Sequence, residues 1–247
     1  MTVYPNVKVN LGLHVLRKRA DGYHDLETLF IPSFSFRDRL DIDYSDRFAF
    51  EADVQWKDDL TVRAYRLLKD EFGLPPVRIR LEKHSPVGAG LGGGSADAAF
   101  ALRALNDMFS LGLDDRALAS RAALLGSDCA FFIYNRPMLG SGRGEILEPF
   151  DIDLSGLELR IHVPEGESVS TGEAYRNIIP REPETALREI LTLPASQWRE
   201  KLENDFEQVI FPSHPAIGEI KAEMYAEGAV YASMSGSGPA VFGLFRK

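Results

Sequence analysis

A run of small residues at positions 86–95, Pro-Val-Gly-Ala-Gly-Leu-Gly-Gly-Gly-Ser, has the composition of an anion-binding loop. Five of its ten residues are glycine, and glycine lets main-chain N–H groups approach a ligand with no Cβ in the way. Alternating apolar residues from Val77 to Glu82 predict a strand before the run, and helical spacing from Ala96 to Phe109 predicts a helix after it. A helix start adds unpaired N–H donors and partial positive charge. The sequence therefore predicts an anion site, most often a phosphate site.

Glycine content alone is also compatible with a flexible turn. The run lacks the GxxxxGK[ST] pattern, and it opens on Pro86 rather than after the first strand of the chain. The common nucleotide-binding loops therefore do not describe it, and a different class of glycine loop is required.

Apolar and polar residues alternate from Val7 to Val15, which predicts a strand with one apolar and one polar face. Lys8 and Asn10 lie on the same polar face. Asparagine is depleted in strands, so its place beside a lysine makes a functional role one interpretation. A solvated strand face is the alternative.

Tyr23 and His24 follow an Asp-Gly turn signal at 21–22. An aromatic ring and an imidazole at a loop exit could stack on a planar ligand and hydrogen-bond to it. A packed tyrosine beside a solvated histidine is the alternative, and the pattern taken alone favours that alternative.

Asp128 precedes an apolar run from Cys129 to Ile133. Ser127 or Asp128 could cap a helix that begins there, which is the simpler interpretation of the spacing. Asp128 could instead be a carboxylate that faces a reacting hydroxyl group, and a helix N-terminus would stabilise its charged form.

The composition is that of an ordinary globular protein. The 247 residues are 45% apolar and 26% charged, with a formal net charge of −9, which argues against general nucleic-acid or membrane binding. A single cysteine, Cys129, excludes an internal disulfide framework. The first ten residues lack the apolar region of a signal peptide, and no apolar run reaches the length of a membrane span. A cytoplasmic location is the expectation.

The remaining pattern alternates between strands and helices. A polar stretch from Pro149 to Gly156 predicts a domain boundary near residue 150. Strands are predicted at Phe36–Tyr44, Phe48–Val54, Leu157–Val163, Val230–Met234 and Ala240–Phe245. Helices are predicted from Asp58 or Asp59 to Lys69, from Asp114 or Asp115 to Gly126, and at 184–192, 196–210 and 215–227.

Three segments together resemble one family, the kinases named after galactose, homoserine, mevalonate and phosphomevalonate (GHMP kinases). The run at 86–95 is similar to the second motif of that family, P-x-x-x-G-L-G-S/G-S/G-S. Lys8-Val9-Asn10 resembles the first motif, and the glycine loop Ser235-Gly236-Ser237-Gly238 resembles the third. The three occur in the family's order along the chain.

The resemblance implies an α+β protein with the two-domain GHMP kinase fold. It implies a ribosomal protein S5 domain 2-like ATP-binding domain over 1–150, which carries the glycine loop. It also implies a ferredoxin-like substrate-side domain over 151–247, which we expect to be abbreviated at its end. The active site is expected in a cleft between the two domains.

Three further segments are typical of one branch of the family: Gly92–Ala99 with its triple glycine, Arg19–His24, and Leu125–Asp128. That branch phosphorylates the 2-hydroxyl of 4-diphosphocytidyl-2-C-methyl-D-erythritol in non-mevalonate isoprenoid biosynthesis. The resemblance therefore implies ATP-dependent phosphorylation of this cytidyl diphosphate sugar alcohol. The alternatives are a homoserine or mevalonate type of kinase and a non-catalytic nucleotide-binding regulator.

The resemblance also implies roles for individual residues, with ATP and Mg²⁺ as cofactors. Asp128 would accept the hydroxyl proton beside Lys8, and no carboxylate is assigned to the metal. Small molecules are the expected partners, with no nucleic acid or membrane, in a monomer or homodimer. The substrate-binding residues would be Asn10, Tyr23, His24 and Tyr175, with the two tyrosines on either side of the cytosine. The nucleotide-binding residues would be Lys83 near the adenine, Pro86, Gly88, Ala89, Gly90, Leu91, Gly92, Gly93, Gly94 and Ser95.

The chain departs from the family pattern at three of these places. Ser85 precedes Pro86 where leucine is usual, and Cys129 follows Asp128 where valine is usual. Asp59 stands where the family has an adenine-side asparagine.

Overall fold

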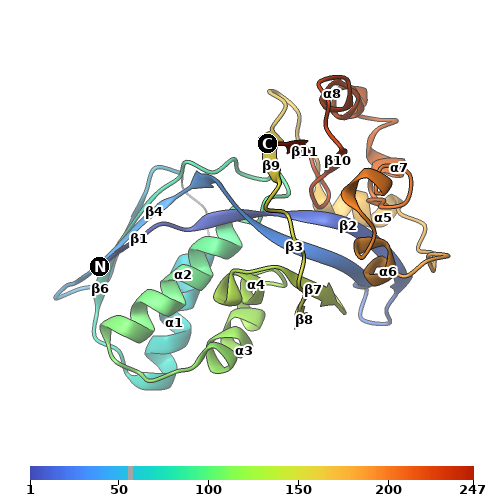
Figure 1. Cartoon of the computed structure of the whole chain (residues 1–247). Coiled ribbons are helices and arrows are strands. Elements are labelled where there is room, and N and C mark those ends of the chain that lie inside the picture. The colour runs from blue at the N-terminus through green and yellow to red at the C-terminus, as the bar shows by residue number, and fades with distance from the viewer. Residues whose placement is uncertain (55–57) are drawn as a thin grey trace. The chain divides into compact units, whose positions relative to one another are not determined.

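The computed structural model describes residues 1–54 and 58–247 (Figure 1). The chain folds as two compact units, each assembled from several chain segments. Unit 1 comprises Met1–Val7, Phe34–Val87 and Gly92–Arg136, and unit 2 comprises Lys8–Ser33, Gly88–Leu91 and Pro137–Lys247. The sequence predicted two consecutive domains, 1–150 and 151–247, and that division stays a prediction.

Unit 1 contains a four-stranded sheet in the order β1-β4-β6-β5. Its strands are β1 (Thr2–Val3), β4 (Arg39–Tyr44), β5 (Ala49–Ala52) and β6 (Val77–Glu82). β6 pairs with β4 antiparallel and with β5 parallel. Burial alternates strictly along β6, because one face of the sheet packs on the core and the other meets solvent. The strand predicted before the glycine run is confirmed.

The described part of unit 1 has helices of which two begin at aspartates that the sequence predicted as caps. They are α1 (Leu60–Phe72), α2 (Gly93–Met108), α3 (Asp115–Leu125) and α4 (Cys129–Tyr134). The side chain of Asp59 accepts from the N–H of Thr61, and that of Asp114 accepts from the N–H of Ala117. α1 ends at Gly73 in the left-handed conformation. These helices were predicted, and Asp59 is now seen as the cap of α1.

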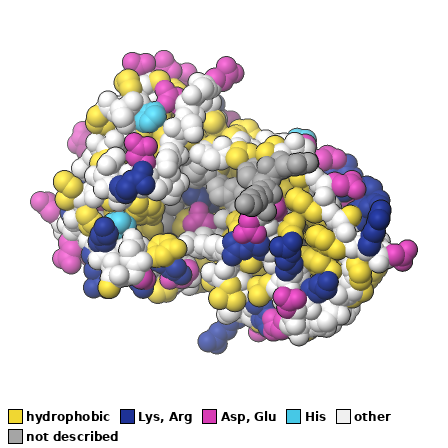
Figure 2. Space-filling model, turned by 180° about the vertical axis from the view of Figure 1, so that it is seen from behind, with side chains coloured by type: hydrophobic (Ala, Val, Ile, Leu, Met, Phe, Trp, Pro, Cys, Tyr) yellow, Lys and Arg dark blue, Asp and Glu magenta, His cyan; other side chains and the backbone are white. Residues whose placement is uncertain are grey.

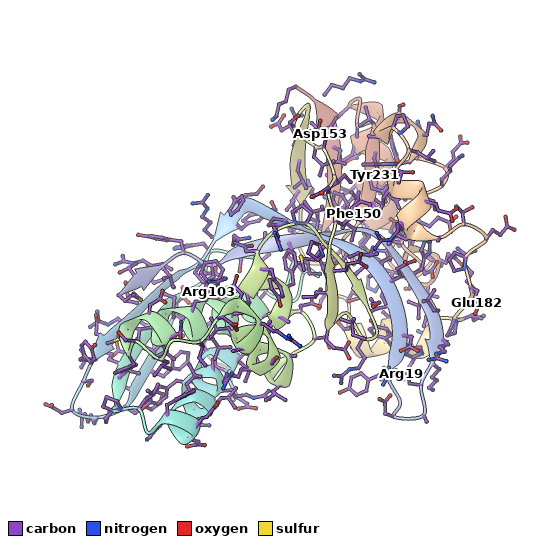
Figure 3. All side chains as sticks on the ribbon, turned by 60° about the horizontal axis from the view of Figure 1, so that its bottom comes forward. Arg19, Arg103, Phe150, Asp153, Glu182 and Tyr231 are labelled. Carbon is purple, nitrogen blue, oxygen red and sulfur yellow. The ribbon has the colours of Figure 1, made fainter. Side chains whose placement is uncertain are left out.

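The helices of unit 1 pack on one another, and α2 also packs on β4. Figure 1 shows α1 and α2 side by side. Arg103 of α2, labelled in Figure 3, donates to the carbonyl oxygen of Ile133 over 3.1 Å and to Asp115 over 2.8 Å. One guanidinium group thus joins α2 to the end of α4 and the start of α3.

Unit 2 holds most of a four-stranded sheet in the order β2-β3-β7-β8. Its strands are β2 (Asn6–Lys18), β3 (His24–Arg37), β7 (Met138–Ser141) and β8 (Ile146–Pro149). β2 was predicted, but the interpretation of 36–44 as one strand is wrong. β3 ends at Arg37, β4 begins at Arg39, and Asp38 lies between them. The start of β3 escaped prediction because Pro32 and burial on both faces break its alternation.

The second sheet of unit 2 has the order β10-β11-β9 and is antiparallel throughout. Its strands are β9 (Leu157–His162), β10 (Tyr231–Met234) and β11 (Val241–Arg246), and helix α8 (Pro215–Ala226) packs against β10 and β11. Tyr231, labelled in Figure 3, is buried and donates its hydroxyl to the carbonyl oxygen of Leu202. These three strands and α8 were predicted.

The segment between the sheets of unit 2 forms short helices. They are α5 (Thr171–Asn177), α6 (Leu187–Leu191), the 3-10 helix η1 (Ala195–Gln197) and α7 (Glu207–Ile210). The predicted helix over 196–210 is therefore mostly wrong. Asn204 and Asp205 interrupt it, because their side chains bind backbone groups elsewhere in unit 2 instead of continuing a helix.

Charged side chains of both signs are interspersed on the face drawn in Figure 2. Within residues 1–54 and 58–247, none of the helices combines the length and the apolar character that crossing a membrane requires.

Candidate active site

The three segments that resemble family motifs meet at one atom in unit 2, the carbonyl oxygen of Gly90. The carbonyl oxygen of Gly90 accepts a hydrogen bond from Lys8 Nζ at 2.8 Å and from Ser235 Oγ at 3.0 Å. The backbone N–H of Lys8 also donates to the carbonyl oxygen of Leu91 over 2.9 Å. A Cβ added to Gly236 would lie 3.5 Å from Lys8 Nζ. Segments far apart in the sequence are therefore assembled around the lysine that the sequence singled out.

The polar face of β2 is buried rather than solvated. Lys8 is 3% exposed and Asn10 is 2% exposed. Lys8 Nζ donates to Asn10 Oδ1 over 2.5 Å, and Asn10 Nδ2 donates to Thr28 Oγ1 over 3.0 Å. The hydroxyl of Thr28 in turn donates to the carbonyl oxygen of Gly12 over 2.6 Å. This chain fixes the lysine and the amide in direction, as a site for a polar ligand requires.

His24 and Tyr175 stack on each other within unit 2. Their ring centroids are 5.2 Å apart with an interplanar angle of 24°, and Phe206 packs edge-on against Tyr175 at 4.8 Å. His24 is 7% exposed, so it is not the solvated histidine of the alternative interpretation. Burial, with a smaller contribution from the positive charge of Lys18, lowers the pKa of His24. The imidazole is therefore neutral near pH 7 and has one donor and one acceptor nitrogen.

Tyr23 lies on the hairpin between β2 and β3 and is 55% exposed. The guanidinium of Arg143 lies 4.9 Å from the centre of its ring, a cation–π distance. Tyr23 thus has an open aromatic face beside a positive charge. Its predicted place opposite Tyr175 stays a prediction.

The glycine run turns through three left-handed residues. Gly88, Gly90 and Gly92 have φ angles of 70°, 77° and 73°. Residues with a Cβ adopt such angles only at a cost in conformational free energy. α2 starts directly after Gly92, and no side chain caps it. The first N–H groups of this helix therefore point outward as donors, which is the condition for an anion site at a helix start.

Cys129, which directly follows Asp128 in the chain, contacts the first turn of α2 inside unit 1. The thiol of Cys129 is hydrogen-bonded to the side chain of Ser95, on the first turn of α2. Burial raises the pKa of this thiol to about 12. Asp128 occupies the N-cap position of α4, as the capping interpretation predicts, but its side chain makes no capping hydrogen bond. The role of Asp128 as proton acceptor stays a prediction.

Lys83 is buried in unit 1, where its ammonium pairs with Asp38 and, over 2.6 Å, with Asp97. Burial raises the pKa of Asp97 to about 8, partly opposed by Lys83. Burial also acts against the charge of Asp38, but hydrogen bonds from Lys83 and Ser85 outweigh it and lower its pKa. The sequence did not anticipate this cluster. A contact of Lys83 with adenine stays a prediction.

The structure divides the predicted site residues between the two units. Unit 2 holds Lys8, Asn10, Tyr23, His24, Tyr175 and the glycine-run residues 88–91, whereas unit 1 holds Lys83, Pro86, residues 92–95 and Asp128. Sequence reasoning missed Thr28, Asp38 and Asn204. Of these only Asn204 left a signal, since an Asn-Asp pair is unusual inside a predicted helix. Its amide donates to the carbonyl oxygens of Met234 and Gly236 over 2.7 and 2.8 Å.

Comparison with known proteins identifies the class. The family described as GHMP kinases N terminal domain matches residues 59–136, and that described as GHMP kinases C terminal matches residues 179–247. The chain belongs to the GHMP kinases, a family of ATP-dependent small-molecule kinases, and the predicted α+β GHMP kinase fold is confirmed.

Within the family, the chain is similar to proteins of one specificity. It is 49% identical to the 4-diphosphocytidyl-2-C-methyl-D-erythritol kinase of Bacteroides thetaiotaomicron, over 99% of this chain and 92% of the relative. A crystal structure of 4-(cytidine 5'-diphospho)-2C-methyl-D-erythritol kinase matches with a TM-score of 0.83 and 36% identity, covering 99% and 90% of the two chains. Homoserine kinase from Cytophaga hutchinsonii matches with a TM-score of 0.72 and 19% identity, covering 100% and 84%, which shows the shared fold alone.

Proposed function

We propose that this kinase transfers the γ-phosphoryl group of ATP to the 2-hydroxyl of 4-diphosphocytidyl-2-C-methyl-D-erythritol. The observation that carries the proposal is that Lys8 and Ser235 both donate hydrogen bonds to the carbonyl oxygen of Gly90. These bonds join all three family motifs. The names of the similar proteins support the choice of alcohol over homoserine or mevalonate.

Asp128 is the proposed proton acceptor. Its carboxylate takes the proton of the 2-hydroxyl as that oxygen bonds to the γ-phosphorus, while the bond from phosphorus to the leaving ADP oxygen breaks. Lys8 is proposed to face the same reacting oxygen and to stabilise its developing negative charge. Positioning supplies most of the acceleration, because phosphoryl transfer demands little covalent chemistry of the protein.

The residues of the glycine run and the start of α2 fit a nucleoside triphosphate. The left-handed glycines and the uncapped start of α2 supply main-chain donors for phosphate oxygens. Within the described parts of the chain, no three His, Cys, Asp or Glu side chains gather to hold a metal. Mg²⁺ needs no such group, since it binds largely through substrate phosphates and water. We propose Ser95 as the residue that contacts Mg²⁺. The metal ion would neutralise charge at the phosphates.

His24 and Asn10 are proposed to hydrogen-bond the substrate, with Tyr23 and Tyr175 on either side of the cytosine. The burial of His24 and Asn10 supports fixed polar contacts, and the exposed ring of Tyr23 supports a face that a ligand covers. A cytoplasmic location, the absence of nucleic-acid partners and a monomeric or homodimeric state stay predictions.

A coupled assay for ADP release tests the proposed substrate. The cytidyl methylerythritol substrate, homoserine and mevalonate are compared at equal concentration with ATP and Mg²⁺. We expect ADP only with the first. ADP release with homoserine or mevalonate would assign the chain to those types, and ATP binding without ADP release from any alcohol would indicate a non-catalytic regulator.

Replacing Tyr23 tests the aromatic contact. Tyr23→Ala is expected to weaken binding of the cytidyl substrate by ~1–3 kcal/mol, because stacking on the base is lost. Calorimetric titration with the substrate measures the change. Tyr44→Ala is a matched control, since this tyrosine of unit 1 is also exposed. Unchanged affinity in the Tyr23 variant removes that ring from the substrate site.

A further inference from the structure

Asp38 collects an unusual number of donors from one short segment. It accepts from the backbone N–H groups of His84 and Ser85, each over 2.7 Å, and from Ser85 Oγ over 2.6 Å. The ammonium of Lys83 is its fourth donor. Both carboxylate oxygens are therefore occupied by the three residues that lead into Pro86 and the glycine run.

The same cluster reaches the helix that leaves the glycine run. Lys83 Nζ also donates to Asp97, on the second turn of α2, over 2.6 Å. A Cβ at Gly93 would lie 2.5 Å from Ser85 Oγ and 3.3 Å from Lys83 Nζ, so the first residue of α2 sits directly against the cluster. The entry and the exit of the glycine run are thus tied to one another inside unit 1.

Burying these charged side chains is an inefficient way to stabilise the fold. The side chains of Lys83, Asp38 and Asp97 are at most 4% exposed. Removing the charges of Lys83 and Asp38 from water costs several kcal/mol per ion, and well-packed apolar residues of similar volume are often as stabilising or more so. The cluster does fix direction, because its hydrogen bonds orient consecutive peptide groups, which apolar packing cannot do.

We propose that Asp38 is a positioning residue for ATP, which holds residues 83–85 and, through Lys83 and Asp97, the start of α2 in the arrangement that binds the phosphates. Asp38 itself does not touch the nucleotide. Its effect is exerted through the N–H donors of α2 and the backbone before Pro86. The proposal rests on the proposed use of ATP and adds a residue that lies outside all three family motifs.

Asp38→Asn tests the proposal, because asparagine keeps the volume but loses the charge and one acceptor oxygen. Calorimetric titration with a non-hydrolysable ATP analogue and Mg²⁺ is expected to show affinity reduced about tenfold or more, since small displacements of positioning groups have effects of this size. In steady-state assays KM for ATP should rise while KM for the alcohol stays within about twofold. Reduced kcat with both KM values unchanged would instead indicate a smaller folded fraction and overturn the positioning role.

Glu71→Gln is the matched control, because it removes an ion pair with Arg121 elsewhere in unit 1 and is expected to leave ATP affinity unchanged. If Asp38→Asn does not fold, Ser85→Ala removes one donor to Asp38 and tests the same point, with a weaker loss of ATP affinity expected. Wild-type affinity in whichever variant folds overturns the proposal. Failure of the wild-type protein to bind the analogue overturns the proposed function instead.

Discussion

Asp128→Asn is expected to lower kcat by a factor on the order of 10²–10⁴, the usual contribution of a positioned proton acceptor. The amide cannot take the hydroxyl proton, but its shape is close to that of the carboxylate. ATP affinity should therefore stay close to the wild-type value. Single-turnover ADP formation, with calorimetric ATP binding measured on the same preparation, separates the two effects.

Asp114→Asn is the control for the Asp128 variant. Asp114 caps α3 in the same unit, and asparagine caps a helix about as well as aspartate. This variant should have wild-type kcat and stability. If Asp128→Asn also turned over at the wild-type rate, Asp128 would have no part in the proton transfer.

Gly90→Ala should be among the most damaging single-methyl additions in the protein. An added Cβ would lie 2.1 Å from the carbonyl oxygen of Ser235, at a φ of 77°. The left-handed conformation costs roughly 1–2 kcal/mol, and overpacking against backbone adds roughly 1–3 kcal/mol. We expect the free energy of unfolding to fall by roughly 2–5 kcal/mol, measured by urea denaturation.

Gly88→Ala separates the two causes. Gly88 has nearly the same φ, 70°, but a Cβ there would meet none of the described atoms within 4 Å. Its unfolding free energy should fall only by the conformational term, roughly 1–2 kcal/mol. Equal losses in the two variants would mean that the contact between the glycine run and Ser235 does not constrain the fold.

The sequence predicted the regular elements best where a local rule decided them. β6 follows from strict alternation, and α1 and α3 follow from Asp59 and Asp114 at their caps and from glycine at their ends. β3 was missed because its burial depends on sheets that form around it. The predicted helix over 196–210 failed because Asn204 and Asp205 make long-range bonds that no local pattern reveals.

The candidate site shows the same division between local and long-range information. Lys8, Asn10 and the glycine run were found from spacing and from resemblance to a family, because these residues sit in short motifs. Asp38 was not found, since it is a single aspartate between two strands, and its partners lie 45 to 47 residues further along the chain. The hydrogen bonds of Asp38 can be recognised only in the folded chain.

The buried thiol of Cys129 has a practical consequence. It is fully shielded, and with its pKa raised to about 12 it holds almost no thiolate near neutral pH. Maleimide reagents should therefore leave the native protein unlabelled. A cysteine engineered at an open position such as Ile179, which is 83% exposed, would carry a fluorescent dye without any need to replace the natural one.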